Sequence, residues 1–305
     1  MPQMTPALFD ELIRSVILPG KRSHKGQNGR LLIIGGSSLF HAASLWAASV
    51  ACRMVDMVHY ASTQENEEVF INLKTKFVDG IILPRKDLLS YVEEDDCILL
   101  GPGMLRGEIA DATKENAHMS FEEILALTAE SDFTYAMTRY LLKNFPHKRF
   151  VLDAGALQMM ELEWLQHMQE KPILTPHSRE FQQLFGHSAL GESPEQLAQN
   201  IRTLAKKHNC VIMMKYVEDH ISDGNQYAVV EGGNEGLAKG GSGDVLAGLT
   251  SALYTRNDSF ASCVLSSFIL KSAAEELYKI VGPFFSTSDL IVQIGKSAKK
   301  LLFDF

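Results

Sequence analysis

The chain has 305 residues, and 29 basic against 37 acidic side chains give it a formal charge of −8. This acidic balance, without any run of Lys or Arg, argues against a nucleic-acid-binding surface. No apolar run approaches the roughly 20 residues that a membrane-spanning helix requires, and we expect no signal peptide because the N-terminus lacks an apolar core. The four cysteines form no CxxC motif, so we expect reduced thiols in a cytoplasmic protein, with neither disulfides nor a zinc site.

Short apolar runs alternate with helical stretches from residue 30 onward. The sequence predicts strands at residues 30–34, 57–61, 79–83, 97–100, 150–152, 172–175 and 211–214. It predicts helices at residues 45–55, 133–143 and 195–208, the last begun by Ser193 as a cap and Pro194 in the first turn. Strands that are apolar on both faces and alternate with helices are typical of a mainly parallel sheet covered on both sides, a three-layer α/β/α fold.

The pattern changes beyond residue 215. Residues 217–230 contain two strand-like runs around Asp223-Gly224-Asn225, which predicts a hairpin. A glycine-dense segment follows, and then helices from residue 244 to the end. Neither a repeat nor a low-complexity linker interrupts the chain, so we expect a single domain over residues 1–305, with residues 1–20 as an N-terminal extension.

Glycines and polar residues gather where the predicted strands end. They are Gly35-Gly36, Gly101-Pro102-Gly103, Asp153, Thr175-Pro176-His177 and Lys215. Ligands of open α/β sheets bind outside the carboxyl ends of the strands. We therefore expect the functional site at this edge of the sheet.

The segment GLAKGGSGDVLAG, residues 236–248, carries the clearest chemical signal. A glycine-rich turn leading into a helix points backbone N–H groups at one spot, where the helix dipole adds positive character. This predicts an anion site, and Asp244 beside it predicts a base that takes the proton of a hydroxyl attacking a phosphate. The alternative is that Asp244 only caps the helix and the glycines only turn the chain. The segment matches neither a Walker A loop nor the dinucleotide GxGxxG motif.

This segment resembles the signature of the ribokinase-like superfamily, and most closely that of the NAD(P)H-hydrate dehydratases. The resemblance runs from about residue 21 to 295, with further pieces in the family's order: KGQNGRLLIIGGSS, ILLGPGM, FVLDAGAL, ILTPHSREFQQLFG and VIMMKYVEDHI. It implies a ribokinase-like fold and an enzyme of nicotinamide nucleotide repair, a carbon–oxygen lyase. The family restores NADH or NADPH from the S-form of the hydrate: ADP or ATP phosphorylates the ring hydroxyl, and phosphate then leaves by elimination. Magnesium is the implied cofactor, because it shields the charge of phosphates.

The resemblance also implies roles for a small set of residues. Asp244 is the implied base, and the implied anion hole for the transferred phosphate is Gly241, Ser242 and Gly243. The implied substrate contacts are Ala43, Gly103, His177 and Asp244, and the implied nucleotide contacts are Lys215 and Gly243. It implies no metal-ligating residue.

Some of these residues have a structural alternative. His177 is also typical of a loop histidine bonded to backbone, and Glu180, three residues on, of a helix cap as much as of a metal or water ligand. We expect Lys215 to be exposed at its strand end, either as a phosphate ligand or as a solvated side chain. The other histidines, such as His59, show no ligand spacing and are expected to be structural or at the surface.

The chain departs from the family's pattern at Gly155, Ser178, Tyr216, Asp219 and Lys239. We expect these changes to cluster at the nucleotide side, where Tyr216 narrows the approach to the backbone and Asp219 adds negative charge. Lys239 suggests a compensating cation beside the phosphates. The sequence therefore leaves open the choice between ADP and ATP, and between NADH hydrate and NADPH hydrate.

Two other functions remain open on the sequence alone. One is a kinase of the same superfamily acting on a vitamin alcohol, and the other is a nucleotide-binding protein that has lost catalysis. Relatives assemble into tetramers or larger, so the resemblance implies a homo-oligomer, with neither nucleic acid nor membrane as a partner. Only about 20 residues precede Lys21, too few for a fused epimerase domain, so we expect the NAD(P)H-hydrate epimerase to be a separate chain.

Overall fold

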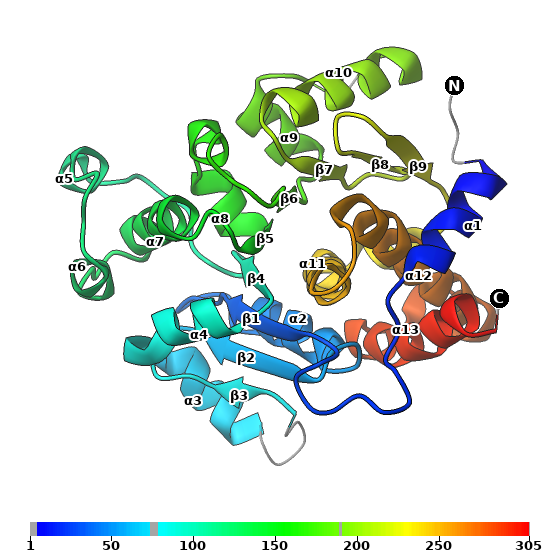
Figure 1. The fold of residues 1–305 in the computed structure, drawn as a ribbon, viewed down its shortest axis with the longest axis horizontal. Coiled ribbons are helices and arrows are strands. Elements are labelled where there is room, and N and C mark those ends of the chain that lie inside the picture. The colour runs from blue at the N-terminus through cyan, green and yellow to red at the C-terminus, as the bar shows by residue number, and fades with distance from the viewer. Residues whose placement is uncertain (1–4, 74–78, 189–190, 305) are drawn as a thin grey trace.

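The computed structural model describes residues 5–73, 79–188 and 191–304. Within these residues nine strands form one sheet in the order β3-β2-β1-β4-β5-β6-β7-β8-β9 (Figure 1). The strands are β1 (Arg30–Ile34), β2 (Met57–Ala61), β3 (Ile81–Ile82), β4 (Cys97–Leu100), β5 (Arg149–Leu152), β6 (Ile173–Leu174), β7 (Val211–Met214), β8 (Asp219–Ser222) and β9 (Tyr227–Val230). Strands β1 to β7 are parallel, whereas β8 runs antiparallel to both β7 and β9. The predicted parallel sheet and its hairpin are confirmed.

Helices cover both faces of this sheet (Figure 1). One layer holds α1 (Pro6–Ser15), α2 (Ala42–Ala51), α11 (Ser242–Tyr254), α12 (Ser259–Val281) and α13 (Thr287–Leu302). The other holds α4 (Leu88–Glu94), α6 (Phe121–Leu125), α7 (Glu130–Asn144), α8 (Ala154–Met159), α9 (Ser178–Phe185) and α10 (Pro194–Lys207). The remaining elements are α3 (Gln64–Leu73), α5 (Asp111–Glu115) and the short 3-10 helices η1 (Arg85–Asp87), η2 (Leu162–Leu165), η3 (Glu235–Ala238) and η4 (Gly282–Phe284).

The strands are buried on both sides because their residues alternate between the two layers. In β1, Leu31 and Ile33 join the core of the first layer, and Leu32 and Ile34 join that of the second. This explains the continuous apolar runs in the sequence. Among the helices that the described residues form, none is long and apolar enough to cross a bilayer.

The strand order reverses between β1 and β4, and this places a crevice at their carboxyl ends. The chain runs outward from β1 through β2 to β3 and then returns to β4 on the other side of β1. The loops that follow β1 and β4 are hydrogen-bonded to each other at their starts. Gly36 N–H donates to the carbonyl of Pro102 at 2.7 Å, and Gly101 N–H donates to that of Ile34 at 3.0 Å.

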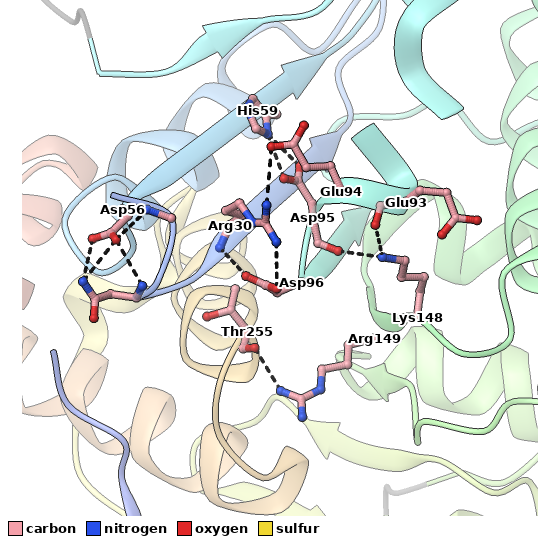
Figure 2. A network of polar contacts seen from close by, with 12 residues as sticks. Arg30, Asp56, His59, Glu93, Glu94, Asp95, Asp96, Lys148, Arg149 and Thr255 are labelled. Carbon is pink, nitrogen blue, oxygen red and sulfur yellow. Dashed lines mark hydrogen bonds and ion pairs between the residues drawn. The ribbon is translucent and has the colours of Figure 1, made fainter. Parts of the chain in front are cut away.

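The opposite end of the sheet carries a network of charges that the chain satisfies itself (Figure 2). Asp96 accepts the backbone N–H of Arg30 at 2.8 Å, and Arg149 donates to the carbonyl of Thr255 at 3.0 Å. His59 and Asp95 form a fully buried pair at 2.8 Å, which confirms a structural place for this histidine. The amino ends of the strands are therefore braced, and the carboxyl ends are left for ligands.

Candidate active site

Helix α11 begins at the glycine-rich turn, at the carboxyl edge of the sheet. Gly241, directly before the helix, has φ +100°, and a Cβ there would lie 2.5 Å from the indole ring of Trp46 on α2. A glycine is needed here both for the backbone conformation and for the close packing. The turn is thereby pinned to α2.

The first N–H groups of α11 are free to bind an anion. No side chain caps the helix, and among the described residues Gly241 and Gly243 N–H have no acceptor. Ser242 N–H makes a long contact of 3.4 Å with the carbonyl of Lys239. Uncapped amides at a helix start form the kind of anion site that the sequence predicts.

Asp244 lies in the first turn of α11 and is half-buried. Burial raises the pKa of its carboxyl to about 7, and the charge of Asp153 adds to this, while Lys215 opposes it. A carboxyl with such a pKa is largely ionised at slightly alkaline pH and is basic enough to accept a proton from a bound hydroxyl.

Lys215, at the end of β7, is held by Asp153, at the end of β5. Its Nζ lies 2.7 Å from Asp153 Oδ1, and the same oxygen accepts the hydroxyl of Thr175 at 2.6 Å. Burial alone would lower the pKa of Lys215, but Asp153, Glu180 and Asp244 raise it, so the side chain stays charged. The expectation of an exposed lysine was wrong: 18% of the side chain is exposed, because its partner draws it inward.

The Lys215 ammonium also faces the start of α11. A Cβ on Gly243 would lie 3.5 Å from Nζ, so the glycine leaves the ammonium next to the free amides. The cation and the helix dipole add positive character at the same point. Lys215, which the resemblance implies as a nucleotide contact, thus lies beside Gly243 and Asp244 of the glycine-rich segment.

His177 and Glu180 cap the start of α9. Nδ1 of His177 accepts the backbone N–H of Arg179 at 3.1 Å, and Glu180 Oε2 accepts that of His177 at 2.9 Å, which completes a capping box. The structural alternatives for both residues are therefore observed. Half of the His177 side chain is nevertheless exposed, 49%, and its backbone pairs with that of Lys215 through a β-bridge, so the residue lies next to Lys215.

Ala43 and Gly103 also come together, in the crevice between β1 and β4. Gly103 has φ +75°, and a Cβ there would lie 3.0 Å from that of Ala43 and 2.9 Å from the carbonyl of Phe40. The glycine allows this close approach. Because Ala43 and Trp46 lie one turn apart on α2, and Trp46 touches Gly241, the crevice lies beside the start of α11.

A cavity of about 500 Å³, here the donor cavity, opens on the other side of this helix start. Lys215, Tyr216, Gly233, Ser242 and Gly243 are among the residues that line it. Tyr216 is 53% exposed and forms part of the wall, as expected for a residue that narrows the approach.

Asp219 lines the donor cavity, on the side that the sequence predicts, but its charge is paired within the protein. Its carboxylate is buried, accepts the hydroxyl of Ser267 at 2.6 Å and the N–H of Tyr216 at 3.1 Å, and lies 3.8 Å from Lys271 Nζ. Burial raises its pKa, and Lys271 opposes the rise. The negative charge is therefore countered within the protein.

Two other departures lie away from the donor cavity, which corrects the expected clustering. A Cβ at Gly155 would lie 2.2 Å from the carbonyl of Met104, so no larger residue fits beside the turn after β4. Lys239 Nζ donates to the carbonyls of Pro283 and Phe285, at 2.6 and 2.5 Å, and so holds η4 rather than facing a phosphate.

The sequence reasoning missed the parts played by Asp153, Thr175 and Trp46. Asp153 carried a signal, as a polar residue directly after a strand, but its partner Lys215 is 62 positions away. In the part of the chain that the structure describes, no group of three or more histidine, cysteine, aspartate or glutamate side chains is arranged to hold a metal ion.

Comparison with known proteins fits this geometry. The family model described as NAD(P)H-hydrate dehydratase matches residues 31–295. The ADP-dependent (S)-NAD(P)H-hydrate dehydratase of Cenarchaeum symbiosum is 29% identical, over 90% of each chain. The bifunctional NAD(P)H-hydrate repair enzyme Nnr of Methanocaldococcus jannaschii is 30% identical over 91% of this chain, which spans about half, 49%, of that relative's length.

Solved structures agree on the fold. The ADP/ATP-dependent NAD(P)H-hydrate dehydratase of Bacillus subtilis, co-crystallised with ATP and Mg²⁺, superposes with a TM-score of 0.75 at 20% identity and covers 98% of each chain. A ribokinase-like superfamily protein of Enterococcus faecalis gives 0.73 at 20% identity, over 96% of this chain and 94% of its own. The expected ribokinase-like fold is confirmed. Since the family model covers most of the sequence, the chain belongs to the NAD(P)H-hydrate dehydratase family.

Proposed function

We propose that this protein dehydrates the S-form of NAD(P)H hydrate back to NADH or NADPH, with ADP or ATP as phosphoryl donor. The observation that carries the proposal is the placement of Asp244: a half-buried carboxylate, with its pKa raised to about 7, beside free helix amides and the Lys215 ammonium. Base, anion site and cation are the parts that phosphoryl transfer to a hydroxyl requires. The names of the relatives support the same reaction.

In the first step Asp244 takes the proton of the ring hydroxyl, whose oxygen then bonds to the terminal phosphorus of the nucleotide. The bond from that phosphorus to the bridging oxygen breaks, so ADP leaves as AMP, or ATP as ADP. The amides of Gly241, Ser242 and Gly243 and the ammonium of Lys215 stabilise the charge of the transferred group. Asp153 acts through Lys215, because it fixes where the ammonium lies.

In the second step phosphate leaves the ring with the electron pair of the carbon–oxygen bond. The neighbouring ring carbon loses a proton, and the double bond of the reduced nicotinamide is restored. Phosphate is a far better leaving group than hydroxide, which is why a phosphoryl donor serves a dehydration. We place the ring between Ala43, Gly103 and His177, next to Asp244.

Magnesium fits this site as a companion of the nucleotide. The cation usually keeps several waters and binds through substrate phosphates with one or two carboxylates, and the carboxylates of Asp153 and Glu180 lie near enough to Asp244 to affect its pKa. When bound, it would neutralise phosphate charge. The nucleotide itself would occupy the donor cavity.

We also propose that the protein works in the cytoplasm as a homo-oligomer, a tetramer or larger. Its function would be linked to that of an epimerase that interconverts the two forms of the hydrate, and the match to half of a bifunctional repair enzyme supports this link.

The test is recovery of the NADH absorbance band when the protein is mixed with NADH hydrate and ADP or ATP. We expect recovery with at least one donor, and a loss of about 10²-fold or more in kcat for Asp244→Asn. Asp111→Asn, an exposed aspartate on α5, is the matched control and should turn over normally. Recovery with neither donor would overturn the proposal in favour of a protein without catalysis, and a loss below tenfold in Asp244→Asn would remove the assigned base.

A further inference from the structure

A second cavity lies at the same edge of the sheet, toward β2. It has a volume of about 480 Å³, and Gly35 and Gly36 after β1, Ser62 after β2 and Met104 after β4 bound its floor. The volume falls within the range of small-molecule sites, about 300–1,000 Å³. Gly36 Cα would lie 3.2 Å from a Cβ on Gly103, so this cavity continues the crevice in which we place the nicotinamide ring.

Arg85 supplies this cavity with a fixed cation. Its Nε donates to the carbonyl of Ser62 at 2.7 Å, and its guanidinium lies over the ring of Phe133, 5.0 Å from the centroid. These two contacts set the plane of the guanidinium. Its Nη groups have no hydrogen-bond acceptor among the residues described, so they can donate to a phosphate.

One part of the wall is apolar and accommodates a flat ring, while hydroxyl, amide and carboxyl side chains such as Thr63, Gln64 and Glu65 line the remainder. Leucines from three elements or their loops line it together with the Phe133 ring: Leu88, Leu105, Leu125 and Leu127. Glu130 Oε1 accepts the N–H of Ser38 at 3.0 Å, and its Oε2 is buried without a hydrogen-bond partner among the described residues, so it can accept a hydroxyl or amino hydrogen of a ligand. A base, which has two apolar faces, fits such a surface.

The start of α2 lies between this cavity and the nicotinamide crevice. The helix begins at Ala42 without a side-chain cap, and Ala43 touches Gly103. Free N–H groups at a helix start favour phosphate. A dinucleotide stretched from the crevice to the cavity would carry its pyrophosphate across this point.

We propose that this cavity binds the adenosine half of the dinucleotide hydrate, with the base against the leucines and a phosphate on Arg85. The inference rests on the proposed function and adds a second anchor to it. The adenosine half takes no part in the chemistry, so its binding supplies energy from outside the reacting ring.

The test compares NADH hydrate and NADPH hydrate with the hydrate of reduced nicotinamide mononucleotide, which lacks the adenosine half. We expect Arg85→Gln to raise KM for the dinucleotide hydrates about tenfold, which equals roughly 1.4 kcal/mol, and to leave KM for the mononucleotide unchanged. An effect on both dinucleotides places the adenosine-side phosphate on Arg85, and an effect on NADPH hydrate alone places the 2′-phosphate there. Arg53→Gln, at an exposed arginine after α2, is the matched control.

Two further measurements separate this role from a defect in folding. Leu127→Trp keeps the guanidinium but fills the cavity, and it should raise the same KM values without changing the melting temperature by more than a few degrees. Fluorescence titration of intact NADH, with AMP saturating the donor cavity, should show a Kd about tenfold higher in both variants. Unchanged NADH affinity, or an equal rise of KM for the mononucleotide hydrate, would overturn the proposal.

The titration also distinguishes the two proposals from each other. If the wild type turns over no hydrate but NADH binding depends on Arg85, the proposed reaction fails and the cavity remains a dinucleotide site. If hydrates are turned over and neither KM nor NADH affinity depends on Arg85, the cavity assignment fails alone.

Discussion

Asp244 has the two properties that a base working near neutral pH needs: a place beside an anion site and a pKa raised to about 7 by burial and by the charge of Asp153. Since only the ionised carboxylate accepts a proton, kcat/KM should fall about tenfold per pH unit below pH 7 and level off above it. A pH–rate profile between pH 5 and 9 measures this limb. In Asp153→Asn the limb should move to lower pH, because one of the charges that repel the Asp244 carboxylate is gone while Lys215 remains. An unmoved limb would contradict the assigned coupling.

The same carboxyl makes a prediction about stability. Its pKa is about 7 in the folded state and near 3.8 when unperturbed, so the folded protein binds this proton more tightly than the unfolded chain. The contribution of this carboxyl to the stability of the folded protein therefore increases as the pH falls from 7 toward 4. Above pH 7 the carboxyl is ionised and destabilises the folded state. At pH 8 we expect Asp244→Asn to raise the free energy of unfolding by roughly 1–3 kcal/mol, and at pH 4 to leave it nearly unchanged. Urea unfolding at the two pH values checks this, and a loss of stability at pH 8 would disprove it.

The place of a single residue could be predicted when its contacts are with neighbours in the sequence, and could not when its partner is distant in the sequence. Asp244 and its glycines are neighbours in the sequence, so the chemistry of the turn could be read directly. The pairing of Lys215 with Asp153 joins the ends of two strands 62 residues apart, and this contact is what buries the lysine. The place of Lys239 was likewise set by a distant partner, the carbonyl of Pro283 on η4.

At the scale of elements, the turn into α11 should depend on one glycine and not on its neighbour. Gly241 has φ +100° and packs on Trp46, whereas a Cβ on Gly240 would have nothing within 4 Å. We expect Gly241→Ala to lower the free energy of unfolding by at least about 1–2 kcal/mol and to weaken nucleotide binding, because the free amides move. Gly240→Ala, one residue away, should do neither. Differential scanning calorimetry and nucleotide titration of the two variants provide the comparison, and equal behaviour would refute the assigned role of the turn.

The elements that could be predicted are those whose pattern is long or strongly bounded. Strands β1, β2, β4 and β7 match their predicted ranges residue for residue, because each is an apolar run with polar or glycine neighbours. Strand β3 is reduced to two residues, since it pairs at the edge with β2 alone. Short helices such as α6 were missed: it has five residues, too few to show a period, although its capping box at Ser120 and Glu123 is visible in the sequence.

In the molecule as a whole, the candidate active site lies at one end of the sheet, and the ion pairs that stabilise the fold lie at the other. The carboxyl ends hold free amides, a perturbed carboxyl and two cavities, whereas the amino ends hold charges that are paired within the chain (Figure 2). Groups at a functional site need partners that a ligand can supply, and such groups weaken the fold until the ligand binds. The paired end can offset this, because its charges already have partners within the chain.

The buried pair of His59 and Asp95 is the place to test that separation. His59→Leu leaves a buried carboxylate without its partner, since Asp95 bonds to His59 through both oxygens at 2.9 and 2.8 Å. We expect the free energy of unfolding at pH 7 to fall by about 3 kcal/mol, and kcat and KM to stay within twofold, because the site lies at the other end of the strands.

Burial already raises the pKa of Asp95 against the effect of His59. Without the histidine the pKa of Asp95 rises further, so the loss of stability should shrink as the pH falls and the carboxyl takes up a proton. His147→Gln breaks the exposed counterpart, 3.3 Å from Glu93, and should cost less than about 1 kcal/mol. A change in KM as large as the change in stability would mean that the two ends are coupled.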